Sequence, residues 1–226
     1  MSRMTGGVRR IVSTVGLTGL LLSVPFAAAA QQPGTHPYAF GGVVVSWQEG
    51  ATTDEHRTYL TAPGGWTPGV LAGAGIRILP QLGIEGQFRR TGVLERVEPS
   101  RHFFTYLAQR RDTAVAVAAR LRMPLSPGLT IEPVGLLEFV YEQSWLASRR
   151  DGPVPEPAMP PPAPFVNSWS RGIAGGVDLR TGRGRAAFVP GVRMHWTPRG
   201  EEAVSTWPGG RSTWSVDFTA SLHFGS

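Results

Sequence analysis

The stretch that decides the fold is "STWSVDFTASLHF", residues 212–224, near the carboxyl end of the sequence. Apolar and polar side chains alternate along it without a break. Successive side chains of a β-strand point to opposite faces, so the stretch predicts a strand with one apolar and one polar face. The apolar face carries Trp214, Val216, Phe218, Ala220, Leu222 and Phe224. Whether that face points into the protein or out of it determines the class of protein.

The amino-terminal end has the features of a secretory signal peptide. Arg3, Arg9 and Arg10 precede an apolar run from Ile11 to Ala30 that ends in four alanines. A basic region, an apolar region and small residues in that order are typical of such signals. We therefore expect a signal peptide over residues 1–30 and one mature domain over residues 31–226. No later stretch approaches the ~20 continuous apolar residues of a membrane helix.

The composition excludes several classes of site. The sequence has no cysteine, so disulfides and thiolate metal sites are not available. All 22 basic residues are arginine, and the three that precede the predicted cleavage site leave +3 of the formal charge of +6. The arginines are scattered among acidic residues, which gives little support to nucleic-acid binding. We expect no cofactor and no nucleic-acid partner.

Eight stretches are predicted to be strands, and their connections alternate in length. They cover about 38–48, 69–79, 83–91, 112–124, 129–143, 168–180, 185–197 and 212–224. Three short turns alternate with four longer segments, one of which holds seven prolines in residues 151–164 and is expected to be a surface loop. An even number of strands with this rhythm is typical of outer-membrane β-barrels.

The tryptophans all lie at or near strand ends that adjoin the long segments. They are Trp47, Trp66, Trp145, Trp169, Trp196, Trp207 and Trp214. Tryptophan favours the interface between membrane and water, so this placement predicts an aromatic belt at one end of a barrel.

The polar faces of the predicted strands collect charged residues, which we interpret as a charge network inside the barrel. Its expected members are Arg77, Glu85, Arg89, Arg120, Arg122, Glu132, Glu138, Asp178, Arg180, Arg193, His195 and Asp217. Two turns predict opposite-charge cross-strand pairs, Arg77 with Glu85 and Arg122 with Glu132. Pairing Trp196 with Trp214 across the last loop predicts a third, Arg193 with Asp217. A narrow lumen needs such neutralisation, so we expect the apolar faces to contact lipid. The first strand is apolar on both faces, which leaves the orientation of its side chains open.

With these features the sequence resembles the family of small eight-stranded bacterial outer-membrane β-barrel proteins. The resemblance covers the whole mature chain and implies an all-β, eight-stranded antiparallel up-and-down transmembrane barrel. In that family the last strand, with its terminal aromatic residue, is read by the outer-membrane assembly machinery, and Phe224 takes this position here. Gly225 and Ser226 follow it, which departs from the usual ending. The resemblance implies outer-membrane lipids and that machinery as partners, and we expect a monomer.

The leading functional hypothesis is a non-enzymatic membrane-structural or surface-interaction protein with long extracellular loops. Eight strands enclose a lumen that side chains can fill, so we expect no general pore. Three alternatives remain open: a narrow channel for small solutes, a lipid-modifying enzyme similar to lipid A deacylases, and a secreted lipocalin-like protein that binds an apolar ligand.

One grouping resembles the catalytic set of an acyl-transfer enzyme. His195 and Thr197 are followed closely by Glu201 and Glu202. In lipid A deacylases such residues face lipid, whereas the alternation points His195 into the lumen. We therefore expect no catalytic role for this group.

Two further groupings are weaker. Asp217 and His223 share a strand face, but six residues separate them by about 20 Å, too far for a triad. Asp54, Glu55 and His56 are adjacent in the first long segment. Three adjacent side chains rarely converge on one ion, so no metal site is expected.

Overall fold

The computed structural model describes residues 36–50, 63–99, 104–150, 164–182, 185–198 and 213–225. The predicted signal peptide and nearly all of the proline-rich segment lie outside these residues. Within the described part of the chain, no helix is long and apolar enough to cross a membrane.

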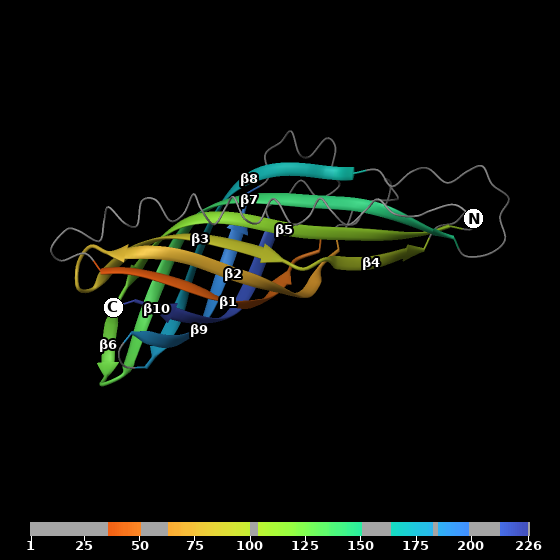
Figure 1. Ribbon diagram of the computed structural model, residues 1–226. Helices are drawn as coiled ribbons and strands as arrows, with labels where there is room; N and C mark the ends of the chain where they lie inside the picture. The colour runs from red at the N-terminus through yellow and green to blue at the C-terminus, as the bar shows by residue number, and fades with distance from the viewer. Residues whose placement is uncertain are drawn as a thin grey trace, which may run out of the picture.

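The described residues form ten strands (Figure 1). They are β1 (His36–Gln48), β2 (Gly65–Arg77), β3 (Leu82–Thr91), β4 (Leu94–Pro99), β5 (Phe104–Leu121), β6 (Met123–Ser126), β7 (Leu129–Arg150), β8 (Pro164–Thr181), β9 (Ala186–Thr197) and β10 (Thr213–Phe224).

Eight of these strands close into an antiparallel barrel. The hydrogen-bonded order is β1-β2-β3-β5-β7-β8-β9-β10, and β10 pairs with β1 to complete the ring. Every consecutive pair is antiparallel, so the barrel is of the up-and-down type. Closure leaves no open sheet edge around the ring. The predicted fold class is therefore confirmed by the strand pairing.

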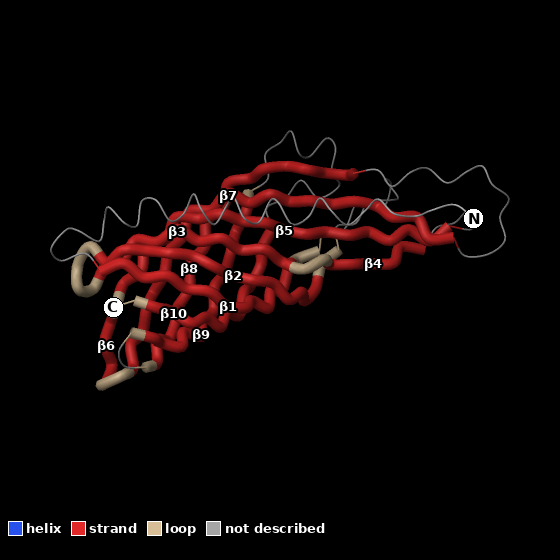
Figure 2. The backbone as a smooth tube through the Cα atoms, viewed as in Figure 1, coloured by secondary structure: helices blue, strands red, loops and turns tan. Residues whose placement is uncertain are grey.

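The two ends of the barrel differ in their connections. The short turns between β2 and β3, β6 and β7, and β8 and β9 lie at one end, which we call the turn end. The opposite end is called the loop end. There, β4, β5, β7 and β8 continue well beyond the rest of the ring, as the right-hand side of Figure 2 shows.

The eight predicted strands match the eight strands of the ring, but the segment before residue 104 differs from its prediction. It was expected to be irregular, whereas β4 pairs with β5 from Leu94↔Arg110 to Pro99↔Thr105. The prediction was wrong because β5 begins earlier than expected, and its edge offers unpaired backbone groups to the preceding residues. β7 and β8 also extend beyond their predicted limits.

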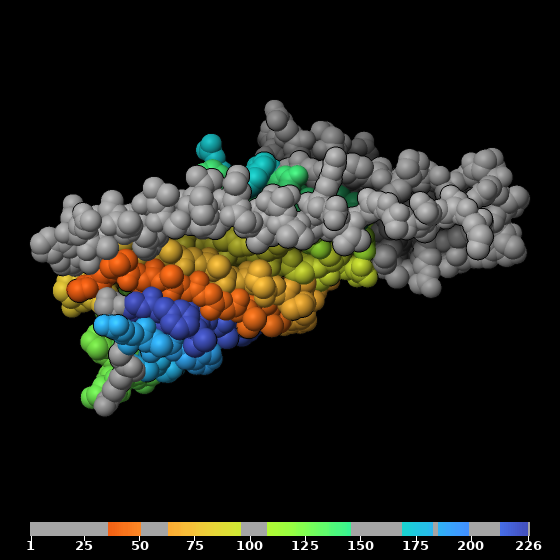
Figure 3. All heavy atoms as spheres, in the orientation of Figure 1, coloured from red at the N-terminus to blue at the C-terminus, as the bar shows by residue number. Residues whose placement is uncertain are grey.

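The orientation of β10 answers the question that its sequence raises. Phe218 is 47% exposed and Leu222 is 49% exposed on the outer surface, whereas Asp217 is 1% exposed in the lumen. The other strands also expose apolar side chains outside, whereas the lumen holds buried polar side chains together with apolar ones such as Val44 and Leu136. Side chains of β1, β2, β9 and β10 form one continuous outer surface in Figure 3.

The first strand, whose orientation the sequence left open, places Tyr38 and Phe40 inside. Tyr38 and Phe40 are buried, while Val43 and Val45 are exposed. The Phe40 ring stacks on His223 with a centroid distance of 4.7 Å. Gly73 of β2 makes room for this ring, because a Cβ there would lie 2.3 Å from Phe40 Cζ.

The register confirms one of the three predicted cross-strand pairs directly and corrects another. Arg193 lies opposite Asp217, as predicted. Arg77 lies opposite Gly83, and Glu85 lies opposite Gly75, so the prediction for the first turn was wrong by two residues. The cause is the turn itself, which is centred one residue earlier and is closed by backbone hydrogen bonds between Leu79 and Leu82.

Candidate functional site: the charged lumen

The lumen holds the charged residues that the sequence analysis singled out. Nine are buried: Glu85, Arg89, Arg120, Glu132, Glu138, Asp178, Arg193, His195 and Asp217. The other three are half-buried near the turn end: Arg77, Arg122 and Arg180. They come from seven strands and from the residue that joins β5 to β6.

Arg120 is the centre of the largest ion-pair cluster. Its guanidinium lies 2.8 Å from Glu85, 3.0 Å from Glu132 and 2.6 Å from Asp178. Asp178 also accepts a hydrogen bond of 2.8 Å from Arg193. One cation therefore holds three carboxylates from β3, β7 and β8, which ties distant parts of the wall together across the lumen.

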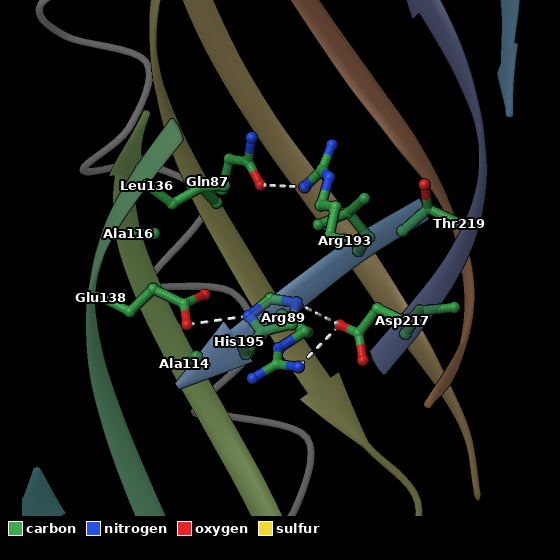
Figure 4. A pocket seen from close by; sticks show the side chains of 12 residues that line it. Gln87, Arg89, Ala114, Ala116, Leu136, Glu138, Arg193, His195, Asp217 and Thr219 are labelled. Carbon is green, nitrogen blue, oxygen red and sulfur yellow. Dashed lines mark hydrogen bonds and ion pairs between the residues drawn. The ribbon is translucent and has the colours of Figure 1, made fainter. Parts of the chain in front are cut away.

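A second cluster surrounds His195 (Figure 4). Its Nδ1 lies 2.9 Å from Glu138 Oε2, and its Nε2 lies 3.0 Å from Asp217 Oδ2. Arg89 reaches the same Asp217 oxygen at 2.6 Å. The imidazole thus bridges carboxylates of β7 and β10. Arg193 extends the first cluster, because it also donates a hydrogen bond of 2.6 Å to Gln87, which in turn donates to Glu85.

The sequence analysis missed a third ion-pair group nearer the loop end. Arg110 contacts Asp112 at 3.2 Å and Glu142 at 3.5 Å, and all three residues are buried. The same alternation that selected Arg120 extends back to Asp112 and Arg110, so that pattern could have found them. Arg110 escaped because the predicted strand began only at Asp112, and without Arg110 the carboxylates of Asp112 and Glu142 had no predicted cation partner.

Tyr38 was also missed as a polar partner. Its hydroxyl donates a hydrogen bond of 2.8 Å to Glu85. A strand that is apolar on both faces gives no signal for this role, because only the closed ring brings β1 within reach of a carboxylate on β3.

These contacts fill the lumen with paired charges. Burying a carboxylate or a guanidinium costs free energy unless it is paired and hydrogen-bonded, and here each cluster pairs opposite charges. Between the clusters lies a pocket that Arg89, Glu138, His195 and Asp217 line opposite apolar side chains such as Leu136 (Figure 4). The arrangement supports a rigid core of side chains that fill the lumen.

The described tryptophans lie near the loop end and face outward. Trp47 pairs with Trp66 across β1 and β2, and Trp196 pairs with Trp214 across β9 and β10. The Trp169 ring lies 4.9 Å from Tyr141. Together these six aromatic residues form what we call the aromatic rim.

Two of the predicted belt residues are not part of this rim. Trp145 lies four residues beyond Tyr141, about 13 Å farther along β7, with Arg111 over its ring at 6.0 Å. Trp207 lies outside the described residues. Phe224, the predicted terminal aromatic, is exposed at the turn end of β10.

The proposed acyl-transfer group is not assembled on the outer surface. His195 is 3% exposed inside the lumen, and Glu201 and Glu202 lie outside the described residues. A buried contact of 3.1 Å joins Ser221 to His223, but the Ser221 hydroxyl donates to the Val189 carbonyl.

No metal-binding group appears in the part of the chain that the structure describes. Among these residues, no three or more histidine, cysteine, aspartate or glutamate side chains are grouped so that they could hold a metal ion. Asp54, Glu55 and His56 lie outside that part of the chain.

Comparison with protein-family models and with curated proteins gives no match. Among solved structures, the chain is similar to neisserial surface protein A, with 10% identity, a TM-score of 0.48 and coverage of 84% of this chain and 98% of that one. The attachment invasion locus protein Ail of Yersinia pestis gives 11% identity, a TM-score of 0.47 and coverage of 85% and 99%. OprG of Pseudomonas aeruginosa, an outer membrane protein, gives 11% identity, a TM-score of 0.44 and coverage of 85% and 96%. The fold assignment itself rests on the strand register.

Proposed function

We propose that this chain is a non-enzymatic outer-membrane β-barrel protein with a membrane-structural or surface-interaction role. The observation that carries the proposal is the distribution of polarity across the barrel wall. Apolar side chains such as Leu137, Val117 and Phe218 are exposed on the outside, while charged side chains fill the inside. Water favours the reverse arrangement, so an apolar solvent around the barrel explains it.

The height of the apolar band fits a bilayer. On β10 the outward residues run from Trp214 in the aromatic rim to Phe224 at the turn end. Ten residue steps cover ~34 Å along a strand. At a barrel tilt of ~40° this corresponds to about 26 Å along the membrane normal, close to the apolar band of outer-membrane barrels.

The lumen argues against each alternative function. A lipocalin-like protein needs an apolar cavity, whereas this lumen contains Arg120, Glu85 and Asp217. A lipid A deacylase needs its histidine on the lipid side, whereas His195 is buried inside. A channel needs a continuous path, whereas contacts between Arg193 of β9 and Gln87 of β3, and between Arg89 of β3 and Asp217 of β10, cross this lumen.

A surface-interaction role is supported by the strands that pass beyond the aromatic rim. β7 continues from Tyr141 to Arg150, about 30 Å of extended chain. It pairs there with β5 as far as Arg150 and with β8 as far as Trp145. A hydrogen-bonded extension of this kind offers an ordered platform outside the membrane. In this proposal the protein is a monomer among outer-membrane lipids, and the assembly machinery reads the strand that ends at Phe224.

The test is to express the full-length chain in a Gram-negative host and separate its membranes. We expect the protein in the outer-membrane fraction, with a mobility in detergent gels that changes on heating, as folded barrels commonly show. A soluble protein without a heat-dependent shift would reject the membrane location. It would also make an apolar ligand the next question.

A further inference from the structure

Three arginines gather at the turn end of the lumen. Arg77 is the last residue of β2, Arg122 follows β5 directly, and Arg180 lies next to the last residue of β8. Arg122 comes two residues after the buried Arg120, and Arg180 comes two residues after the buried Asp178. Residues two apart on a strand share a face, so all three side chains belong to the lumen side. We call this group the arginine mouth.

Acidic partners are scarce at the arginine mouth. Arg122 contacts Glu132 at 2.8 Å, but Glu132 is already shared with Arg120 at 3.0 Å. Arg77 Nη2 and Arg180 Nη1 are buried and have no hydrogen-bond partner among the described residues. Guanidinium groups that are partly desolvated and unpaired are costly, so a partner that supplies acceptors would stabilise them.

The three guanidinium groups are close enough to repel one another. The fold forces this proximity. The Arg122 amide donates to the Gln81 carbonyl at 2.6 Å, which places it beside the turn that follows Arg77. Arg180 of β8 approaches from the other side of Arg122. It pairs with Thr130 of β7, which lies two residues from Glu132, the ion-pair partner of Arg122.

We propose that the arginine mouth of Arg77, Arg122 and Arg180 binds a phosphate-type oxyanion. Guanidinium groups match the geometry of phosphate oxygens through paired, charge-assisted hydrogen bonds. A bound phosphate would supply acceptors to the unpartnered nitrogens of Arg77 and Arg180 and would reduce the mutual repulsion. This inference goes beyond the proposed function and rests on the lumen geometry alone.

Two sources could supply this chemistry, and the experiment separates them. One is a free phosphate or phosphate ester in solution at the turn end. The other is the phosphodiester of a lipid headgroup in the adjoining leaflet. The folded, full-length mature domain is therefore prepared in maltoside micelles, which contain no phosphate. It is then titrated either with inorganic phosphate at constant ionic strength or with phosphatidylglycerol added to the micelles.

The primary measurement is the unfolding temperature followed by the heat-dependent gel shift. We expect inorganic phosphate at about five times its dissociation constant to raise the unfolding temperature by about 2–4 °C, relative to chloride at the same ionic strength. A rise with phosphatidylglycerol alone would assign the site to a lipid headgroup, and a rise with both ligands would assign it to phosphate groups in general. The absence of a rise with either ligand would overturn the proposal.

Two variants test whether the arginine mouth is responsible for the rise in unfolding temperature with phosphate. Arg77→Gln combined with Arg180→Gln should abolish the phosphate response, and the fold should persist because these guanidiniums lack described partners. Arg171→Gln is the matched control, since Arg171 is an exposed arginine of the same β8, nine residues away at the other end. A phosphate response that survives in the double variant would place the anion elsewhere and reject the site.

A second readout is independent of thermal stability. The side-chain Nε–Hε resonances of the arginines can be followed by NMR during the same titrations. We expect those of Arg77, Arg122 and Arg180 to shift with a common dissociation constant and that of Arg171 to stay unchanged. Equal shifts at all four arginines would indicate nonspecific ion pairing and contradict the proposal.

Discussion

Arg120 is the residue on which the negative charge of the lumen converges. It is 2% exposed and contacts carboxylates from three strands. Removing one partner of a buried ion pair leaves an uncompensated charge, which costs more than the pair contributes. A single side chain at the centre of the barrel therefore has a large effect on stability.

The Arg120→Met variant tests this role. It removes the cation that Glu85, Glu132 and Asp178 share. Because buried carboxylates then lose their ion-pair partner, we expect the free energy of unfolding to fall by about 3–5 kcal/mol. Urea titration in micelles measures the change. The exposed Arg171→Met variant is the control and should change stability by less than about 0.5 kcal/mol. A loss for Arg120→Met as small as that of the control would mean that the cluster does not act as a unit.

Gly191 gives a second prediction about a single residue. A Cβ at this position would lie 1.8 Å from Asp178 Oδ1, so Gly191→Ala must displace a carboxylate that two arginines hold. We expect a loss of about 1–3 kcal/mol in the free energy of unfolding. Gly135→Ala is the matched control, because its Cβ would meet no atom within 4 Å. Equal effects of the two substitutions would show that space around Asp178 is not limiting.

At this scale the sequence predicts which residues face the lumen but not which of them touch. The alternation placed Arg193 opposite Asp217, and the register agrees. The Arg193 side chain nevertheless contacts Asp178 and Gln87. In so narrow a barrel long side chains reach across the lumen, and contacts across the lumen depend on ring closure, which no local pattern encodes.

The strands themselves were largely predictable where polar and apolar residues alternate strictly. β10 and β9 match their predicted limits to within about one residue. The pattern weakens in "EQSWLASRR", residues 142–150, and the continuation of β7 was missed there. Backbone pairing with β5 and β8 sustains that part of the strand, and pairing does not require alternation.

An arginine placed on the outer face of β7 should destabilise the barrel by an amount that depends on the depth of that position in the membrane. Leu137 is 65% exposed and lies four residues on the turn-end side of Tyr141, and Gln143 lies two residues beyond Tyr141. If the band faces lipid, Leu137→Arg should destabilise the barrel by about 2–4 kcal/mol in lipid vesicles, and Gln143→Arg by about 0–1 kcal/mol.

Reversible unfolding in lipid vesicles measures both variants on β7. The two substitutions introduce the same side chain on the same face of one strand, so the difference between them isolates depth. Equal costs would indicate that the outer surface at Leu137 contacts water, contrary to the proposed membrane location.

For the whole molecule, the closed ring determines whether solutes can pass. The ring joins β1 to β10 and β5 to β7, and side chains from opposite walls meet where Arg193 of β9 contacts Gln87 of β3. Neither closure nor the crossing contacts could be predicted beyond the expectation that eight strands enclose a filled lumen.

The filled lumen predicts that the protein does not conduct ions. We expect the purified protein in a planar lipid bilayer to give no steady conductance above that of detergent alone. Arg193→Ala, which removes the ion pair with Asp178 and the hydrogen bond to Gln87, should also give no steady conductance or only brief openings. Steady, uniform conductance steps from the wild-type protein would instead favour the narrow-channel alternative.

The seam between the first and last strands has a kinetic consequence. Ala39 pairs with Phe224 across it, so the ring cannot close until almost the entire chain has been made. Until then β1 has an unsatisfied edge, and the arginines and carboxylates of the lumen lack their partners from β9 and β10. Contacts between residues so distant in sequence form slowly. Before closure, the open edge of β1 is therefore the part of the chain most prone to pair with another strand and aggregate.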